Sequence, residues 1–448
     1  MEMMKKMVEG EHPTDQMLKL GDLFLLGMQH IAAMCAGAMA VPMIVGNSLG
    51  LSQEEIHILV SAAFMMVGIG TIIQTIGIKG VIGSRLPMIE GVSFAGVAAL
   101  AAIGITYKGS DPIMGLHIMF GATIASGLFC VLAAPVFGKL LKFFPPLVSG
   151  TVVTSMGISL MPVAIRWAGG GNPASAEFGN FKNLLLAFIT LGIIIGIQKI
   201  SKGFLGNIAI LVGIIAGTLI SIPMGIANFS AVKEGAVVTF NAPLQFGLPK
   251  FELTSVISLL LVQLVIMTEC TGNQLNLSNI CGTDEKDEKR LIAGLRAHGL
   301  SSMIAGVFNS FPHALFGQNV GIVAITGVTS RFAGTAAGVI LLIVSFFPKL
   351  TAVFTSIPAP VLGGAGVVMF GIVAAGGIKK LGEVSYVGNK NLLIVAVSIG
   401  LALVPIAVPQ IYQHFPAWGN ILFHSPVTLG CVSVIILNIL FNEVGKKK

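Results

Sequence analysis

Two carboxylates lie inside long apolar runs, and acidic residues are rare in such places. Glu90 and Glu269 are the acidic residues that fall well inside these runs, while nearly all the others lie in polar loops or near the chain ends. A charged side chain costs several kcal/mol or more in lipid, so one that is retained there is a candidate for binding or proton transfer. As a carboxylate Glu269 can only accept hydrogen bonds, which suits the N–H groups of a ligand.

Two histidines also fall in apolar runs, His30 after Gln29 and His298 within Arg296-Ala297-His298. His30 either bonds to a neighbouring helix as a structural residue or takes part in transport, and the residues alone leave both interpretations open. Glu90 is open in the same way. It could bond to a backbone amide, pair with a buried histidine or tune the proton affinity of the site.

The stretch from Phe311 to Gly327 contains the most specific chemistry. Its opening predicts extended chain up to Gly317, and a short helix is predicted from Gln318. The N-terminus of a helix offers unpaired N–H groups to a carbonyl oxygen or a developing anion. The amide of Gln318 adds a donor and an acceptor, matching the N–H and C=O edge of an oxopurine or pyrimidine. With Phe94 stacked on the ring face, these groups predict a pocket for a flat, polar, uncharged heterocycle.

The elements that position these residues must be membrane helices. Only 10% of the 448 residues are charged and 54% are hydrophobic, and the mean hydropathy is +0.92. A soluble domain of this size does not have such a balance. The chain is therefore predicted to be an all-α polytopic membrane protein.

A bilayer core of about 30 Å needs roughly 20 apolar residues per helix, and runs of that kind recur along the chain. Fourteen segments are predicted, at residues 20–44, 54–78, 84–105, 111–136, 145–166, 182–199, 204–228, 253–273, 289–309, 313–326, 332–349, 352–377, 390–408 and 426–442.

Two of these segments are irregular. The segment 84–105 begins at Arg85-Leu86-Pro87, and 313–326 is short and follows Phe311-Pro312. They are the third segment of each half if the chain is two sets of seven, and interrupted segments at matching places indicate an inverted-repeat transporter with a site near the midplane. The alternative is two ordinary kinked helices.

The charged residues favour a definite orientation and exclude several functions. Lys and Arg collect in the loops on one side if both termini are cytoplasmic, as the positive-inside rule requires. They form no basic face for nucleic acid. The chain contains neither G-x-x-x-x-G-K-[ST] nor H-E-x-x-H, so no enzyme or primary pump, no cofactor and no metal site are expected. The five cysteines are widely spaced and are interpreted as small core residues.

Three places in the chain resemble the nucleobase-ascorbate transporter family, also called nucleobase-cation symporter-2. They are Gln29-His30, Glu269, and the run from Gln318-Asn319 through Gly321 and Thr326 to Gly327. The resemblance extends over essentially the whole chain. The last pattern is specific, because it combines Gln or Glu with Asn-x-Gly-x-x-x-x-Thr.

The resemblance implies two inverted repeats of seven segments, with segments 3 and 10 part strand and part helix, and a homodimer. It also implies a core domain that moves against a gate domain. The expected divisions are a cytoplasmic N-terminal tail 1–19, core 20–144 and 251–350, gate 145–250 and 351–443, and a cytoplasmic C-terminal tail 444–448.

The resemblance further implies roles for individual residues. Glu269 and Gln318 would bind the base directly, with Phe94 and Gly317 lining the site. Asn319, Thr326 and His30 would shape the site or set its affinity. Gln318 together with Gly327 resembles the purine branch, since uracil carriers tend to have Glu and Arg at these places. The small Ser93 leaves room for the extra oxygen of uric acid, which is an argument from shape.

The chain departs from the family at one point. Relatives usually have an acidic residue in the ninth segment, where this chain has His298, and Glu90 occupies a third-segment position that is more often apolar or small. We hypothesise that Glu90 and His298 share the task of that single acid.

These observations together predict a proton-coupled symporter that imports xanthine or uric acid across the plasma membrane by alternating access. A uracil or guanine/hypoxanthine permease of the same family is the first alternative, and sodium is the alternative coupling ion. An anion carrier of the same architecture is more remote, because Glu269 would repel an anion and no Lys or Arg lies deep in a span.

Overall fold

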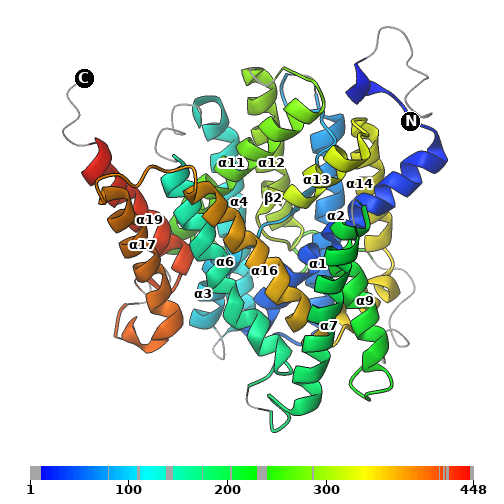
Figure 1. Ribbon diagram of the computed structural model, residues 1–448, viewed down its shortest axis with the longest axis vertical. Coiled ribbons are helices and arrows are strands. Elements are labelled where there is room, and N and C mark those ends of the chain that lie inside the picture. The colour runs from blue at the N-terminus through cyan, green and yellow to red at the C-terminus, as the bar shows by residue number, and fades with distance from the viewer. Residues whose placement is uncertain are drawn as a thin grey trace.

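A computed structural model gives the architecture of the chain (Figure 1). The structure describes residues 12–78, 80–107, 111–137, 145–173, 175–201, 204–229, 240–284, 287–412, 414–416, 419 and 423–443. The predicted C-terminal tail 444–448 and residues 1–11 of the predicted N-terminal tail lie outside this part. Helices dominate, and two very short strands form the only sheet among the described residues.

The first half of the chain contains most of the long helices. After the 3₁₀ turn η2 (Pro13–Asp15) the elements are α1 (Leu20–Leu49), α2 (Gln53–Ile76), β1 (Glu90–Val92), η3 (Phe94–Gly96), α3 (Val97–Tyr107), α4 (Pro112–Ala133), η4 (Ala134–Val136), α6 (Pro146–Ala168), α7 (Phe181–Ile200), α8 (Phe204–Asn207) and α9 (Ala209–Ser221).

The second half has more interruptions. Its elements are α11 (Leu253–Ile280), α12 (Glu288–Val307), β2 (His313–Leu315), α13 (Gly317–Thr326), α14 (Arg331–Ser345), α15 (Pro348–Thr355), α16 (Ala359–Leu381), α17 (Lys390–Ala407), η6 (Pro409–Tyr412), α19 (Pro426–Asn438) and the π turn η7 (Ile439–Glu443).

Local chemistry explains where several helices begin. Ser52 and Glu55 form a reciprocal capping box at the start of α2. Asp111 accepts the Met114 N–H ahead of α4, and Asn180 accepts the Asn183 N–H ahead of α7. Such caps satisfy the orphan amides that every helix start leaves.

The membrane class is confirmed. Each of the fourteen predicted segments contains helical structure. Among the described residues, eight helices are long and apolar enough to cross a bilayer unaided, and four shorter apolar helices accompany them. The five cysteines are all buried, as expected of small core residues.

Two predicted segments are wrong in detail. The segment 352–377 spans a break, because α15 ends at Thr355 and α16 begins only at Ala359. The cause is Pro358, which disfavours helical geometry in the residue before it and so separates the two helices. The segment 204–228 is divided into α8 and α9, and α9 ends at Ser221 shortly before Pro223.

The two irregular segments meet where β1 and β2 pair, and we call this pair of strands the crossing. β1 and β2 pair antiparallel, with Glu90 opposite Leu315, Gly91 opposite Ala314 and Val92 opposite His313. Each strand leads directly into helix, β1 into η3 and α3 and β2 into α13, so both segments are part strand and part helix as expected. The expected helix start at Gln318 is correct to one residue.

Two sets of helices pack closely within themselves, and the division into core and gate domains remains a prediction. In the first group α4 packs on α12, α2 on α14, and α1 on both α2 and α14. In the second group α6 packs on α16, α7 on α9 and α16, and α17 on α19. Figure 1 shows α17 and α19 at one edge and α2 and α14 toward the other, with β2 between.

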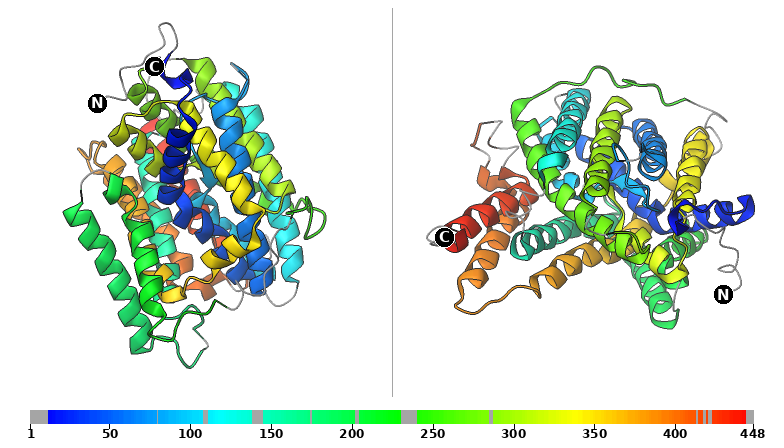
Figure 2. Two further views of the ribbon diagram at one scale, coloured as in Figure 1. Left: turned by 90° about the vertical axis from the view of Figure 1, so that its right-hand side faces the viewer. Right: turned by 90° about the horizontal axis from the view of Figure 1, so that it is seen from above.

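Both ends of the described chain lie at the same end of the molecule. The start of α1 and the red end of the C-terminal helix are both near the top in Figure 1 and in the left view of Figure 2.

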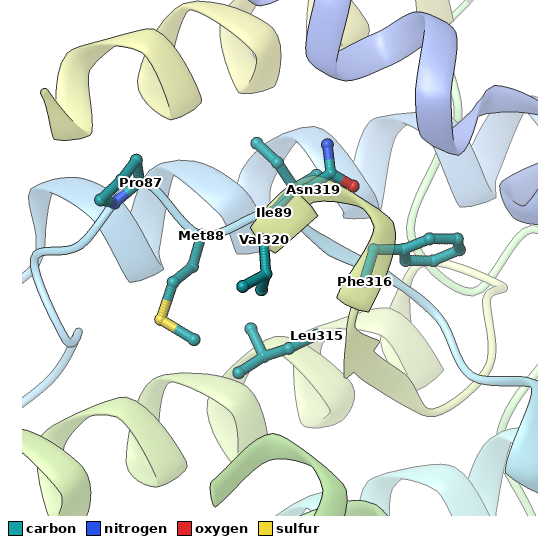
Figure 3. A pocket seen from close by; sticks show the side chains of 7 residues that line it. All are labelled: Pro87, Met88, Ile89, Leu315, Phe316, Asn319 and Val320. Carbon is teal, nitrogen blue, oxygen red and sulfur yellow. The ribbon is translucent and has the colours of Figure 1, made fainter. Parts of the chain in front are cut away.

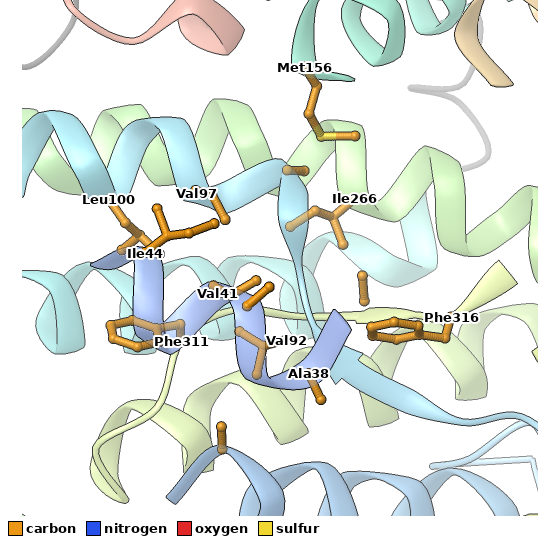
Figure 4. Packing of buried hydrophobic residues seen from close by; sticks show 14 of the residues in the cluster. Ala38, Val41, Ile44, Val92, Val97, Leu100, Met156, Ile266, Phe311 and Phe316 are labelled. Carbon is orange, nitrogen blue, oxygen red and sulfur yellow. The ribbon is translucent and has the colours of Figure 1, made fainter. Parts of the chain in front are cut away.

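Apolar packing immobilises the crossing. Figure 4 shows side chains from α1, β1, α3 and α11 gathered around the two strands, with Phe311 and Phe316 on either side of β2. Val92, Phe311 and Ile266 are each at most 1% exposed. Dense packing of this kind holds a short two-stranded sheet that would be unstable alone.

The N-terminal segment is fastened to this framework by one acidic residue. Asp15 accepts hydrogen bonds from Arg331 Nε at 2.7 Å and Arg85 Nη2 at 3.1 Å, and Arg331 also donates to the Thr75 carbonyl. Burial by itself would raise the pKa of the Asp15 carboxyl, but the hydrogen bonds from the two arginines outweigh it and lower the pKa below its ordinary value. Asp15 thus ties together the chain before α1, the loop before β1 and the start of α14.

Glycine allows α6 and α16 to approach closely, so Gly157→Leu is expected to destabilise the protein. A Cβ at Gly157 would lie 2.6 Å from Ala374 Cα, and backbone cannot move aside as a flexible side chain can. We expect a loss of about 1–3 kcal/mol or more from overpacking, seen as a lower unfolding midpoint of the purified protein in detergent.

Gly192→Leu on α7 is the matched control, because among the described residues no atom lies within 4 Å of a Cβ built there. Equal midpoints for the two variants would show that α6 and α16 are not in close contact.

Candidate functional site

A cavity beside the crossing strands brings together four of the residues that the sequence predicted. Ser93, Phe94, Glu269 and Gly317 all line it, although they come from three separate parts of the chain. The remaining lining residues are Val92, Ala95, Met156, Ala314, Leu315, Phe316 and Val373.

The strands direct two helix starts toward this cavity. β1 ends at Val92, and Ser93 then caps η3 by accepting the Ala95 N–H at 3.2 Å. β2 ends at Leu315, and α13 begins at Gly317 without a side-chain cap at Phe316. The Asn319 N–H bonds to the Phe316 carbonyl at 3.1 Å, so the amides of Gly317 and Gln318 are the ones that the positive end of the helix presents to a ligand.

α11 supplies the carboxylate of the cavity. Glu269 is half-buried there, and within the part of the chain that the structure describes no group donates a hydrogen bond to it. One turn later Asn273 Nδ2 donates to the Leu315 carbonyl at 3.2 Å, and the Leu315 N–H points to Cys270 Sγ at 3.5 Å. These two contacts hold the end of β2 against α11, beside Glu269.

Phe94 lies between aromatic rings of both helix groups. Its ring centroid is 5.7 Å from that of Phe370 on α16, in an edge-on arrangement, and 6.5 Å from that of Phe316. Phe370 is in turn 6.4 Å from Trp167 on α6. Edge-on and tilted pairs at these distances are favourable, so the face of Phe94 is positioned by packing.

The structure describes the side chains of Asn319 and Thr326 in the motif that begins at Gln318, but not that of Gln318 itself. The backbone of Gln318 forms part of α13, but its side chain lies outside the described structure. Asn319 turns away from the cavity, since its Nδ2 donates to His30 Nδ1 at 3.0 Å and to the His30 carbonyl at 3.1 Å. His30 therefore bonds to a neighbouring helix, which is the structural alternative considered for it.

Thr326 is also absent from the residues that line the cavity. Its hydroxyl donates to the Ile322 carbonyl at 2.8 Å and accepts the Val328 N–H at 3.3 Å. The next residue, Gly327, has a φ of 66° and ends α13 in the left-handed conformation that glycine favours. Thr326 and Gly327 thus set where α13 stops.

Glu90 and His298 form a buried pair behind the cavity. Glu90 Oε2 and His298 Nδ1 are 3.1 Å apart, and neither side chain is exposed to solvent. Of the possibilities open for Glu90, the structure selects pairing with a buried histidine. The two carboxylates are therefore separated, with Glu269 in the cavity and Glu90 outside its lining.

A second hollow shares Leu315 and Phe316 with the cavity, and Figure 3 shows its walls. Pro87, Met88, Ile89 and Val320 complete its apolar lining, and Asn319 is the single polar side chain in that lining. The bonds of Asn319 to His30 direct its amide nitrogen toward α1. This hollow has no carboxylate, so the cavity with Glu269 is the candidate site.

Several residues that line the cavity were not predicted from the sequence. Met156 and Val373 come from α6 and α16, and nothing in their own segments marks them as site residues. Asn273 is not in the lining but holds Leu315 beside it, and it could have been found, because a polar residue four positions after Glu269 lies on the same helix face. Phe316 could also have been found, since it directly precedes the predicted helix start.

Comparison with known proteins places the chain in a family. Residues 21–411 match the family model described as "Permease family". The uric acid transporter UacT of Escherichia coli K12 is 41% identical over 96% of this chain and 89% of its own length. The xanthine permease of Bacillus subtilis 168 is 40% identical over 96% of this chain and 95% of its own.

Among solved structures, the transmembrane domain of the cyanobacterial bicarbonate transporter BicA superposes with a TM-score of 0.61 over 95% of this chain and 99% of that one. The sequences are only 18% identical, so this likeness establishes the fold alone. The match along the chain and the two permeases show that the protein is an integral membrane purine permease of the nucleobase-ascorbate transporter family.

Proposed function

We propose that this permease imports xanthine or uric acid together with a proton, by alternating access. The observation that carries the proposal is the cavity in which Glu269, the start of α13 and Phe94 meet. The relatives named uric acid transporter and xanthine permease support the choice of purine.

Each group in the cavity matches a part of an oxopurine. The Glu269 carboxylate accepts from ring N–H groups, and the first amides of α13 donate to ring carbonyl oxygens. Phe94 stacks on the flat face of the base. As the sequence predicts, the Gln318 amide would pair with an N–H and C=O edge, and the small Ser93 in the cavity wall would leave room for the extra oxygen of uric acid. An inorganic anion such as sulfate is disfavoured, because it offers no ring N–H to Glu269 and the carboxylate would repel it.

The way in which the cavity is shared supports alternating access. Glu269, Phe94 and Gly317 belong to the proposed core, whereas Met156 and Val373 belong to the proposed gate. Motion of the core against α6 and α16 would separate Phe94 from Phe370 and open one side of the cavity. The base would then be released without rearrangement of its polar contacts.

The proton supplies the driving force. A potential of 100 mV contributes about 2.3 kcal/mol per charge, which corresponds to accumulation of tens-fold. In place of the ninth-segment acid of relatives, the Glu90–His298 pair would carry the proton. We further propose a homodimer in the plasma membrane with both termini in the cytoplasm, as the loop charges favour.

The test is uptake of radiolabelled xanthine, uric acid, guanine, hypoxanthine and uracil into cells that lack their own carriers, with and without a protonophore. Xanthine or uric acid is expected to accumulate and to stop accumulating when the protonophore is added. Entry of uracil alone, or of guanine or hypoxanthine alone, would assign the chain to an alternative specificity. If accumulation is unaffected by the protonophore but requires sodium, the coupling ion is sodium and not the proton.

A further inference from the structure

Three titratable side chains lie together behind the crossing strands, outside the lining of the cavity. Glu90 on β1, His298 on α12 and His313 on β2 are each 0% exposed. Glu90 and His298 are in direct contact, and His298 interacts electrostatically with His313. We call these three residues, with Ser301, the buried cluster.

The carboxylate of Glu90 is held in place by α2. The Glu90 N–H donates to Thr71 Oγ1 at 3.1 Å, and Gln74 Nε2 lies 3.4 Å from Glu90 Oε1. Gln74 cannot turn its amide around, because its nitrogen also donates to the Gly294 carbonyl and its oxygen accepts the Ser84 N–H. The donor side of Gln74 therefore always faces Glu90.

His313 is tied to the same helix as His298. Its Nδ1 is 2.6 Å from Ser301 Oγ, and its backbone N–H donates to Ser302 Oγ at 3.1 Å. Ser301 follows His298 by three residues on α12, so the two serines and His298 lie within one turn. Within the described structure, Nε2 of His298 and Nε2 of His313 are buried without a hydrogen-bond partner.

The charge of this cluster depends on one proton. Without a proton the carboxylate leaves a buried negative charge, with one proton the cluster is neutral, and with two it is positive. A net charge in such an interior is costly, so the singly protonated cluster is the favoured state. Among the described residues, the other titratable groups that act on it are Glu269 and Cys270 from α11 and Cys130 from α4, while α2 contributes the uncharged Thr71 and Gln74.

The cluster is connected to the cavity through the paired strands. Glu90 is opposite Leu315 and His313 is opposite Val92, and both Leu315 and Val92 line the cavity. His298 also interacts electrostatically with Glu269. A shift of Glu90 or His313 would therefore move its partner residue on the other strand, and that partner forms part of the cavity wall.

We propose that Glu90, His298 and His313 form the proton-binding site of this permease, with one proton shared among them and His313 as its third member. The proposal rests on the proposed proton-coupled transport. The proton site is separate from the base site, and no bond of the base changes. The proton binds from outside when the base binds, stays in the cluster during the core movement, and leaves inside.

The experiment compares two modes of transport in proteoliposomes with the purified protein, using radiolabelled xanthine and uric acid. In one mode a pH gradient drives accumulation; in the other, internal base exchanges with external base without net proton movement. His313→Gln and Ser301→Ala are the variants. His117→Gln is the control, since His117 bonds to the Phe246 carbonyl and, within the described structure, to no member of the cluster.

For His313→Gln we expect gradient-driven accumulation to fall about tenfold or more, because the proton loses a charge-assisted hydrogen-bond partner. Exchange of base for base should be retained. Ser301→Ala should fall in the same direction, and His117→Gln should match wild type. Accumulation equal to wild type in His313→Gln, or equal loss of both modes in the folded variant, would overturn the proposal.

A second measurement does not depend on the base. Titration of purified wild-type protein with a pH indicator is expected to count more bound protons than titration of the Glu90→Gln variant and of His313→Gln. If wild type and variants bind equal numbers of protons, the proposed proton site is wrong, even if xanthine is transported. If the numbers differ but no purine is exchanged, the proton site stands and the proposed substrate is wrong.

Discussion

Glu269→Gln is expected to reduce uptake of xanthine or uric acid about 10-fold to 100-fold, because a hydrogen bond to a charged group is worth about 1.5–3 kcal/mol. The glutamine has nearly the same shape, so the cavity should keep its walls. Its amide nitrogen would face the ring N–H groups of the base, donor against donor. Uptake of labelled base and thermal stabilisation of the purified protein by xanthine measure the loss.

Glu383→Gln is the control for Glu269→Gln, since Glu383 is an exposed residue just after α16. Glu269→Asp adds a test of geometry: it keeps the charge but shortens the side chain by one methylene, and an intermediate loss is expected. If Glu269→Gln transports like wild type, Glu269 does not hold the base and the proposed site is wrong.

Gly91→Ala is expected to abolish transport, because the added methyl group would displace the ring of Phe316 beside the paired strands. A Cβ at Gly91 would overlap the ring of Phe316, and a Cβ at Gly37 on α1 would lie 2.7 Å from the same ring. The ring therefore sits in a slot that two glycines create, and Phe316 is also the residue from which α13 starts. Displacing it would move the first amides of α13, where a shift of about 1 Å can cost 100-fold.

Gly96→Ala is the matched control for Gly91→Ala, because its new Cβ would have only ordinary contacts, the nearest at 3.7 Å. The two variants should differ in uptake and in stabilisation by xanthine, measured on monodisperse protein. The double variant Gly91→Ala, Phe316→Leu is expected to regain part of the stability, since it removes the ring that the methyl group strikes. Equal behaviour of Gly91→Ala and Gly96→Ala would show that the slot does not position α13.

The two carboxylates lie in different surroundings, which suits the two roles proposed for them, base binding for Glu269 and proton binding for Glu90. Glu269 lies in the cavity, where a ligand can reach it, and Glu90 lies against His298 with no solvent exposure. The departure from the family in segments 3 and 9 had suggested that Glu90 and His298 act together. Their 3.1 Å contact supplies the geometry for that hypothesis, and the measurements on His313 test its function.

Much of the site was predictable because its signals are local. Lipid penalises charge wherever it lies in a span, so Glu269 and Glu90 were conspicuous without any knowledge of their neighbours. The extended start and short helix of the tenth segment follow from Pro312 and Gly317, and the structure places the helix start within one residue of the prediction.

The sequence by itself determined the membrane class, the approximate spans, the irregular third and tenth segments and the family, because apolar length, glycine and proline, and a contiguous motif are properties of neighbouring residues. Only the tertiary structure decided which distant residues meet. Met156 and Val373 in the cavity wall, Asn319 on His30, Asp15 between two arginines, and His313 beside Ser301 are examples. Helix periodicity specifies a face but not the helix that covers it, so these partners follow from packing alone.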